Sequence, residues 1–230
     1  MASSWPPRTH ARTHAALAIM HAAVCPALQW MVADYTKFTP GNKPQPNFLR
    51  IIEQIPGFTD TADVTPVLIS QLNWPSYNIP YLRSIFNASG YPAMVAKYGA
   101  EYTYESNSRA LIFARNVSLV TDWMSARALL RYNNYLHDPL AKGDPITGSI
   151  SSRGDFRTPK PVAFGGVDTK VTSMRGSMGP DFDLRVFAES GPTHDQLPFF
   201  AWSGANGAFA SVQHTLVPAE FDFDTVMFEM

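Results

Sequence analysis

The chain is poor in cysteine, in charged residues and in long apolar runs. Its single cysteine, Cys25, excludes an internal disulfide and any metal site built from several cysteines. Charged residues make up 16% of the sequence, well below the usual quarter. The net charge of −1 gives no electrostatic reason to expect nucleic acid or an anionic membrane surface as a partner. No apolar run reaches the length of a transmembrane helix.

Short motifs for common chemistries are also missing. The sequence contains no Gly-x-Ser-x-Gly elbow, no His-Glu-x-x-His pair, no P-loop and no dinucleotide fingerprint. The nearest match to the elbow is Gly176-Ser-Met-Gly179, which has no glycine two residues before the serine. A helical face carrying His10, His14 and His21 would be the one candidate metal site, but surface histidines explain these residues more simply. We therefore predict neither a metal nor another cofactor.

What is present is a turn-rich, aromatic sequence. Aromatic residues reach 13% and there are 19 prolines, which is typical of a packed β-containing domain with many turns. Apolar patterning predicts strands near both ends of the chain and short helices between them. The expected strands cover residues 29–35, 48–55, 166–173, 182–189, 199–202 and 209–214. The expected helices cover 63–72, 81–86, 92–98 and 122–133, the last capped by Thr121, and residues 109–115 are expected to form a short helix or a turn. This order predicts a layered α+β domain.

Residues 1–28 differ in composition from the rest. They contain a tandem Arg-Thr-His-Ala repeat and no acidic residue. This segment fits either a weak targeting sequence or a start that does not belong to the domain. We expect the domain itself to cover residues 29–230.

The stretch 73–81, Asn-Trp-Pro-Ser-Tyr-Asn-Ile-Pro-Tyr, is the candidate working surface. Its two prolines bias the residues before them away from helix and predict a short strand over 74–80. Period-two alternation then puts Ser76 and Asn78 on a polar face and the apolar residues between them on the other. An asparagine held on a stiff backbone can donate its amide hydrogens to an oxyanion. Alternatively, the Asn78 side chain satisfies a turn at a strand end.

This stretch, followed by Asn87-Ala-Ser-Gly-Tyr-Pro92, resembles the phospholipase B-like family of the lamina-ancestor type. Further blocks of resemblance follow in the same order and extend the likeness from Gln29 to the C-terminus. They are Ile52-Glu-Gln-Ile-Pro56, Arg109-Ala-Leu-Ile-Phe113, Val120-Thr-Asp122, Arg131-Tyr-Asn-Asn-Tyr135, Asp138-Pro139, Gly165-Gly-Val-Asp-Thr-Lys-Val171, Ser190-Gly-Pro-Thr193 and Asp195-Gln196.

The resemblance implies an N-terminal-nucleophile hydrolase fold, an αββα sandwich of which this chain carries the C-terminal portion. The implied activity is hydrolysis of acyl ester or amide bonds in phospholipids or related lipids, without a cofactor, in a secreted or lysosomal setting. The implied partners are a lipid or acyl-containing substrate and the family's N-terminal fragment.

The resemblance also assigns roles to two residues. It implies that Asn78 lines the active-site pocket as the oxyanion donor. Arg109 would be its partner and would hold the surroundings of the nucleophile or a carboxylate or phosphate of the substrate; the alternative is a surface ion pair. Trp74 and Tyr77 could wall an acyl pocket, although core packing explains them equally well.

The family's nucleophile is a cysteine that becomes N-terminal after internal cleavage, so that its own α-amine can serve as the base. Cys25 is followed by Pro26-Ala27, which is unlike the family's cysteine context, and we interpret it as an unreactive buried thiol. The chain is thus expected to lack the nucleophile. This leaves two alternatives to an enzyme: a non-catalytic remnant that keeps a lipid or partner pocket, and a plain structural domain.

Two sequons, Asn87-Ala-Ser and Asn116-Val-Ser, would accept glycans in a secreted chain. Asn87 lies where the resembled family also carries a sequon. Both asparagines are expected to be exposed and glycosylated.

Overall fold

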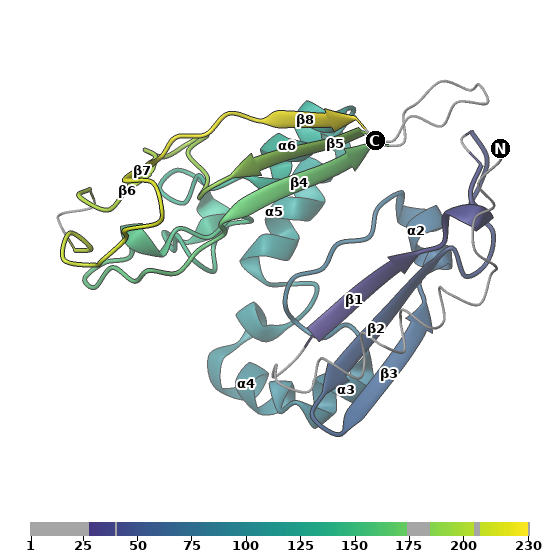
Figure 1. The fold of residues 1–230 in the computed structure, drawn as a ribbon. Helices are drawn as coiled ribbons and strands as arrows, with labels where there is room; N and C mark the ends of the chain where they lie inside the picture. The colour runs from purple at the N-terminus through teal and green to yellow at the C-terminus, as the bar shows by residue number, and fades with distance from the viewer. Residues whose placement is uncertain (1–27, 40, 174–184, 205–207, 230) are drawn as a thin grey trace. The chain divides into compact units, whose positions relative to one another are not determined.

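The computed structural model describes residues 28–39, 41–173, 185–204 and 208–229. The chain divides into two compact units between Ser106 and Asn107 (Figure 1), and each unit is described by itself. Both units combine small antiparallel sheets with short helices, which agrees with the predicted α+β class. The expected domain start at residue 29 stays a prediction.

The first unit is built on an antiparallel sheet in the order β1-β2-β3. Its strands are β1 (Leu28–Ala33), β2 (Leu49–Ile55) and β3 (Phe58–Asp63). The first two confirm the predicted strands. The third was not predicted, because Phe-Thr-Asp-Thr-Ala-Asp offers no continuous apolar face. A Pro56-Gly57 turn joins β2 to β3, and the positive φ of Gly57, 78°, is the conformation that favours glycine at this turn position.

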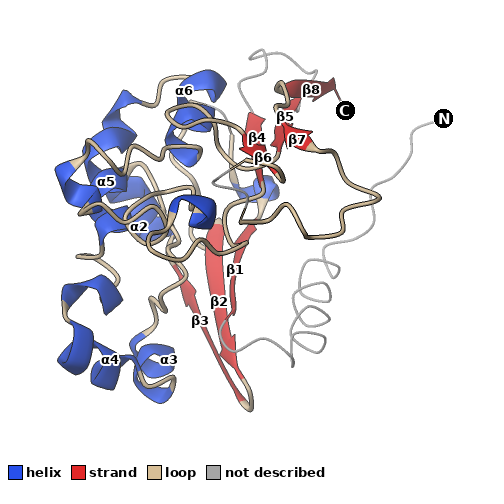
Figure 2. Ribbon diagram, turned by 90° about the vertical axis from the view of Figure 1, so that its left-hand side faces the viewer, coloured by secondary structure: helices blue, strands red, loops and turns tan. Residues whose placement is uncertain are grey.

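Three helices complete this unit, and all three confirm predicted helices. They are α2 (Thr65–Gln71), α3 (Arg83–Ala88) and α4 (Tyr91–Tyr98). Figure 2 shows α3 and α4 on one side of the sheet. Leu49, Ile51 and Val64 form the core, against which the aromatic side chains of Trp74 and Tyr81 pack. The candidate stretch therefore rests directly on the core of its unit.

The second unit begins with α5 (Ser108–Asn116), capped by the side chain of Asn107, and α6 (Trp123–Leu130). The prediction of a helix over 122–133 capped by Thr121 was wrong at both ends. Asp122 is the N-cap and forms a capping box with Ser125. The helix stops at Leu130 because backbone groups after it form hydrogen bonds with residues far away in the chain. The Asn133 N–H, for example, donates to Gln196 Oε1 at 2.8 Å.

The main sheet of this unit has the order β4-β5-β8. Its strands are β4 (Asp168–Ser173), β5 (Arg185–Ser190) and β8 (Val226–Glu229). Helix α6 packs on it, with the rings of Trp123 and Phe187 stacked at 3.9 Å. A smaller sheet pairs β6 (Phe200–Ala201) with β7 (Glu220–Phe221).

Two predictions for the C-terminal part were wrong. Strands β7 and β8 lie in a tail for which no strand was expected. Residues 209–214 form turns instead of the expected strand, because Phe209 is used as a buried anchor against Phe200, at 6.0 Å between ring centres. Residues 136–164 form loops and turns, apart from two short 3-10 helices, η4 (Pro139–Ala141) and η5 (Gly154–Phe156). In the described residues, no helix is long and apolar enough to cross a membrane.

Candidate functional site

The stretch 73–81 runs over the core of the first unit without forming the predicted strand. The prediction was wrong because Asn78 adopts a left-handed backbone conformation, φ 60°, which interrupts an extended course. Asparagine is one of the few residues that tolerates this conformation, as its short polar side chain can bond locally. The predicted alternation of faces is nevertheless confirmed: Ser76 and Asn78 are exposed, whereas Tyr77 and Ile79 are buried.

A buried carboxylate fixes the end of this stretch to the sheet. Glu53 on β2 is only 2% exposed and accepts hydrogen bonds from the backbone N–H groups of Tyr81, at 2.7 Å, and Leu82, at 2.8 Å. The side-chain amide of Gln29 on β1 donates to the same carboxylate at 2.5 Å. Both oxygens of the carboxylate accept a hydrogen bond, Oε1 from Gln29 and Tyr81 and Oε2 from Leu82. These bonds make Glu53 an anchor for the end of the stretch.

Aromatic side chains hold the middle of the stretch. The Tyr104 hydroxyl donates to the carbonyl oxygen of Pro75, and its ring packs against Tyr77 at 5.2 Å between ring centres. Burial raises the pKa of Tyr77 to about 12, since the phenolate would lose its hydration. Trp74 packs edge-on against Tyr81 at 4.6 Å. The structure thus favours the core-packing alternative for Trp74 and Tyr77.

The backbone of Asn78 itself is held from α4. The Tyr91 hydroxyl donates to the Asn78 carbonyl oxygen at 3.1 Å. The neighbours on both sides, Tyr77 and Ile79, are 7% and 6% exposed. The backbone is therefore tied down at this residue while the side chain stays exposed.

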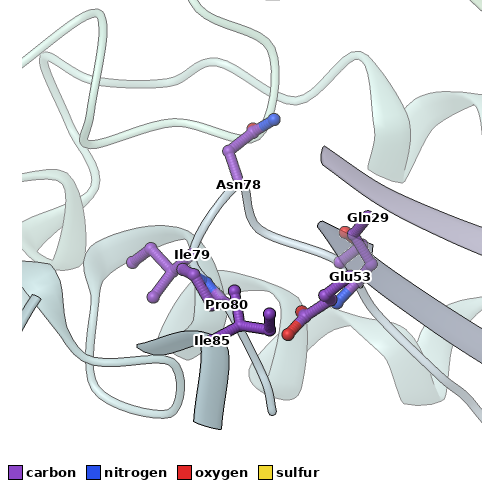
Figure 3. Close-up of a pocket in the computed structure, with 7 residues that line it drawn as sticks. Gln29, Glu53, Asn78, Ile79, Pro80 and Ile85 are labelled. Atoms are coloured by element: carbon purple, nitrogen blue, oxygen red, sulfur yellow. The ribbon is translucent and has the colours of Figure 1, made fainter. Parts of the chain in front are cut away.

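A cavity of about 130 Å3 adjoins Asn78 in the first unit. Its lining residues are Gln29, Glu53, Ser76, Asn78, Ile79, Pro80 and Ile85. Figure 3 shows Gln29 and Glu53 on one side of it and Ile79, Pro80 and Ile85 on the other, with the carboxamide of Asn78 directed away from Ile79. This arrangement can offer a hydrogen-bond donor at the edge of a small, partly apolar cavity.

Arg109, the second predicted site residue, lies in the other unit, in the first turn of α5, and is half-buried. The preceding cap residue, Asn107, is 2% exposed and accepts a hydrogen bond from the Ala110 N–H at 2.9 Å. The start of this helix is thereby fixed, and Arg109 is fixed with it.

The two sequons differ in exposure. Asn87, on α3, is exposed, as predicted. Asn116 closes α5 and is only half-exposed, and Arg115 Nε donates to its Oδ1 at 2.8 Å. The expectation that Asn116 is exposed was therefore wrong.

Several other blocks singled out in the sequence meet in one buried ion-pair network of the second unit. Arg127 lies on α6, and Arg131 is the residue that follows this helix. Both arginines pair with Glu189 on β5 and with Asp195. Burial alone would raise the pKa of Glu189, but hydrogen bonds from Arg127 and Thr225 and the charge of Arg131 lower it below its ordinary value. Sequence reasoning missed this network, because its members are separated by about 60 positions in the chain.

The remaining candidates fall into two groups. Asp168 and Lys170 form an exposed ion pair. Cys25 and the three histidines at positions 10, 14 and 21 lie outside the described residues. Among the residues that the structure does describe, no cluster of three or more histidine, cysteine or acidic side chains could hold a metal ion.

Comparison with known proteins gives the family. The family model for phospholipase B matches residues 20–228. The chain is 43% identical over 204 residues to "Phospholipase B-like protein B" of Dictyostelium discoideum, covering 87% of this chain and 34% of that protein. It is 41% identical over 214 residues to "Putative phospholipase B-like 2" of Homo sapiens, covering 86% of this chain and 35% of the relative. It is 38% identical over 199 residues to "Phospholipase B-like 1" of Bos taurus, with 86% and 35% covered.

The chain thus spans about a third of the length of the curated relatives it matches. The matched region includes the candidate stretch around Asn78, helix α5 with Arg109 and the ion-pair network of the second unit. On this match and these identities, the chain belongs to the phospholipase B family.

Proposed function

We propose that this chain supplies the oxyanion-stabilising part of an acyl hydrolase that acts on phospholipids or related lipids. Membership of the phospholipase B family supports the substrate class. The proposed architecture is the N-terminal-nucleophile sandwich, in which a fragment outside residues 29–230 carries the attacking cysteine. We place this activity in a secreted or lysosomal setting, where Asn87 would carry a glycan.

The observation that carries this proposal is the backbone conformation of Asn78 together with the exposure of its carboxamide. Its backbone is held in a left-handed conformation by the Tyr91 hydroxyl and by two buried neighbours, while its carboxamide remains exposed at a cavity. In acyl transfer the carbonyl oxygen of the substrate becomes an oxyanion, and a donor that is already fixed stabilises it without reorganisation. Asn78 would be that donor.

Arg109 would bind the charged part of the substrate. A guanidinium presents a rigid fork of N–H donors that matches a phosphate or carboxylate. Its place in the fixed first turn of α5 supports a role that needs a defined position. We therefore assign Arg109 to substrate binding and not to the chemical step.

A second candidate is a non-catalytic protein that retains a lipid or partner pocket. The state of Glu53 favours it: the only carboxylate that lines the described cavity is already occupied by donors, so the cavity holds no available base. The two candidates differ in whether activity appears once a nucleophile is provided.

The experiment that separates them is a chimera. Residues 29–230 would replace the aligned part of the Dictyostelium relative, and fatty-acid release from phosphatidylcholine micelles would be measured. An active chimera that loses activity on Asn78→Gly supports the hydrolase. Asn73→Ala is the matched control, because Asn73 lies on the same stretch but donates to Gln71 O at 2.7 Å. A folded but inactive chimera, beside an active parent, supports the non-catalytic candidate.

A further inference from the structure

A second, larger cavity lies in the second unit and takes no part in the proposed hydrolysis. Its volume is about 500 Å3, within the range of roughly 300–1000 Å3 that is usual for small-ligand sites. It is formed by the end of α5, one face of α6 and the turn before η4. The lining residues that matter here are Asn116, Leu119, Tyr132, Asn134, His137 and Gln196.

The sequon asparagine Asn116 is part of this lining. Arg115 Nε donates to Asn116 Oδ1 at 2.8 Å, which orients the carboxamide and leaves Nδ2, the atom that accepts a sugar in a sequon. Arg115 is itself fixed by Asp138 through two hydrogen bonds, at 2.9 and 2.6 Å. Ser118, the third residue of the sequon, is exposed. The glycan acceptor is thus held at the edge of a cavity in a defined orientation.

The rest of the lining suits a sugar. Leu119 is 70% exposed and, with the ring of Tyr132, offers an apolar surface. The side chains of Asn134 and His137 make no hydrogen bond to any other residue in the described parts of the chain. The Gln196 carboxamide accepts one bond through its oxygen, from the Asn133 N–H, which leaves its NH2 group as a donor. N-acetylglucosamine presents the matching groups, namely ring C–H groups, a methyl group, hydroxyls and an amide.

We propose that the first N-acetylglucosamine of a glycan on Asn116 folds back into this cavity and is bound there. In the secretory pathway, Nδ2 attacks C1 of a lipid-linked pyrophosphate oligosaccharide. The bond from C1 to the pyrophosphate oxygen breaks, Nδ2 loses one proton, and the lipid pyrophosphate leaves. The sugar then covers Leu119 and hydrogen-bonds to Asn134, His137 and Gln196. The site is therefore a modification site and a sugar-binding cavity at once.

The chain contains its own control. Asn87 is exposed on α3, so a glycan there would project into solvent. The two glycans should differ in their access to an enzyme that cleaves the bond between asparagine and the first sugar. Asn116 should be protected by the cavity, and Asn87 should not.

The test uses the full chain secreted from a eukaryotic host and treated with peptide N-glycosidase under native conditions. Site-specific mass spectrometry would follow release at each asparagine. We expect release at Asn116 to be at least tenfold slower than at Asn87 in the folded protein, and the difference to disappear after denaturation. An unmodified Asn116, or equal native release rates, would overturn the proposal.

A variant of the cavity lining tests whether the cavity is what slows release at Asn116. In the double variant Asn134→Ala/His137→Ala, release at Asn116 should approach the rate at Asn87, while an unchanged melting temperature of the glycan-free proteins shows that the fold is intact. Persistence of the full protection in the folded double variant would also overturn the proposal, because the cavity lining would then not be what holds the sugar.

Discussion

The carboxylate of Glu53 should be the main anchor of the candidate site, and Glu53→Gln tests this with minimal change in shape. The side chain accepts hydrogen bonds from Gln29, Tyr81 and Leu82 and is 2% exposed. Glutamine has one accepting oxygen, and its NH2 group would face an N–H donor. At least one buried backbone N–H would then lose its acceptor, at about 1–3 kcal/mol, and the surviving bonds would lose the help of the negative charge. The expected total is about 3 kcal/mol of unfolding free energy.

Urea unfolding followed by tryptophan fluorescence measures this loss, since Trp30 and Trp74 both belong to the first unit. With a slope of about 2 kcal/mol per molar urea, the midpoint should fall by about 1.5 M. Hydrogen exchange should also become faster at the amides of Tyr81 and Leu82. Glu105→Gln is the control, because Glu105 is exposed. If both variants unfold within about 0.5 kcal/mol of each other, the reasoning about the anchor is refuted.

Three further predictions concern stability. Arg131→Ala should lower the free energy of unfolding, measured by heat or urea, by about 3–5 kcal/mol, because it leaves buried acceptors without their donor. Arg157→Ala is the control, and since Arg157 is exposed it should lower this free energy by less than about 0.5 kcal/mol. The hydrogen bond from Arg115 lowers the pKa of Asp138 to about 2, below the ordinary 3.8. The contribution of the Asp138 carboxylate to stability is therefore present above about pH 4 and is lost as the pH falls towards 2. In Asp138→Asn, the free energy of unfolding should be lower at neutral pH and flatter across that range. Asn78→Ala should destabilise the chain by about 1 kcal/mol through its left-handed backbone, whereas Asn78→Gly should not, and equal costs for the two would contradict the strain argument.

Local sequence signals predicted most of the helices and the first two strands. Prolines, glycines and caps mark the ends of elements, and these signals act over a few residues. Strand β3 could not be predicted in this way, because its polar sequence is held only by pairing with β2. The end of α6 at Leu130 likewise depends on hydrogen bonds from residues about 60 positions away.

In the candidate site too, local features could be predicted from the sequence and long-range ones could not. The period-two alternation of polar and apolar residues correctly predicted which side chains of 76–79 are buried, since this pattern can be seen in the local sequence. It did not predict the left-handed backbone of Asn78 or the role of Glu53, which arises only when β2 lies beside the start of α3. The assignments of Asn78 and Arg109 came from the family resemblance and stay predictions, as do the hydrolase sandwich and the missing nucleophile.

The most direct test of the central claim is the turnover number of the active chimera with and without Asn78→Gly. Glycine removes the carboxamide but accepts a φ of 60° without strain, so the effect reports the donor and not the backbone. If Asn78 donates to the oxyanion, kcat should fall by about 100- to 1000-fold with KM within a few-fold, and Asn73→Ala should leave both unchanged. A turnover number unchanged by Asn78→Gly would contradict the account and leave Asn78 as a residue that only satisfies a turn.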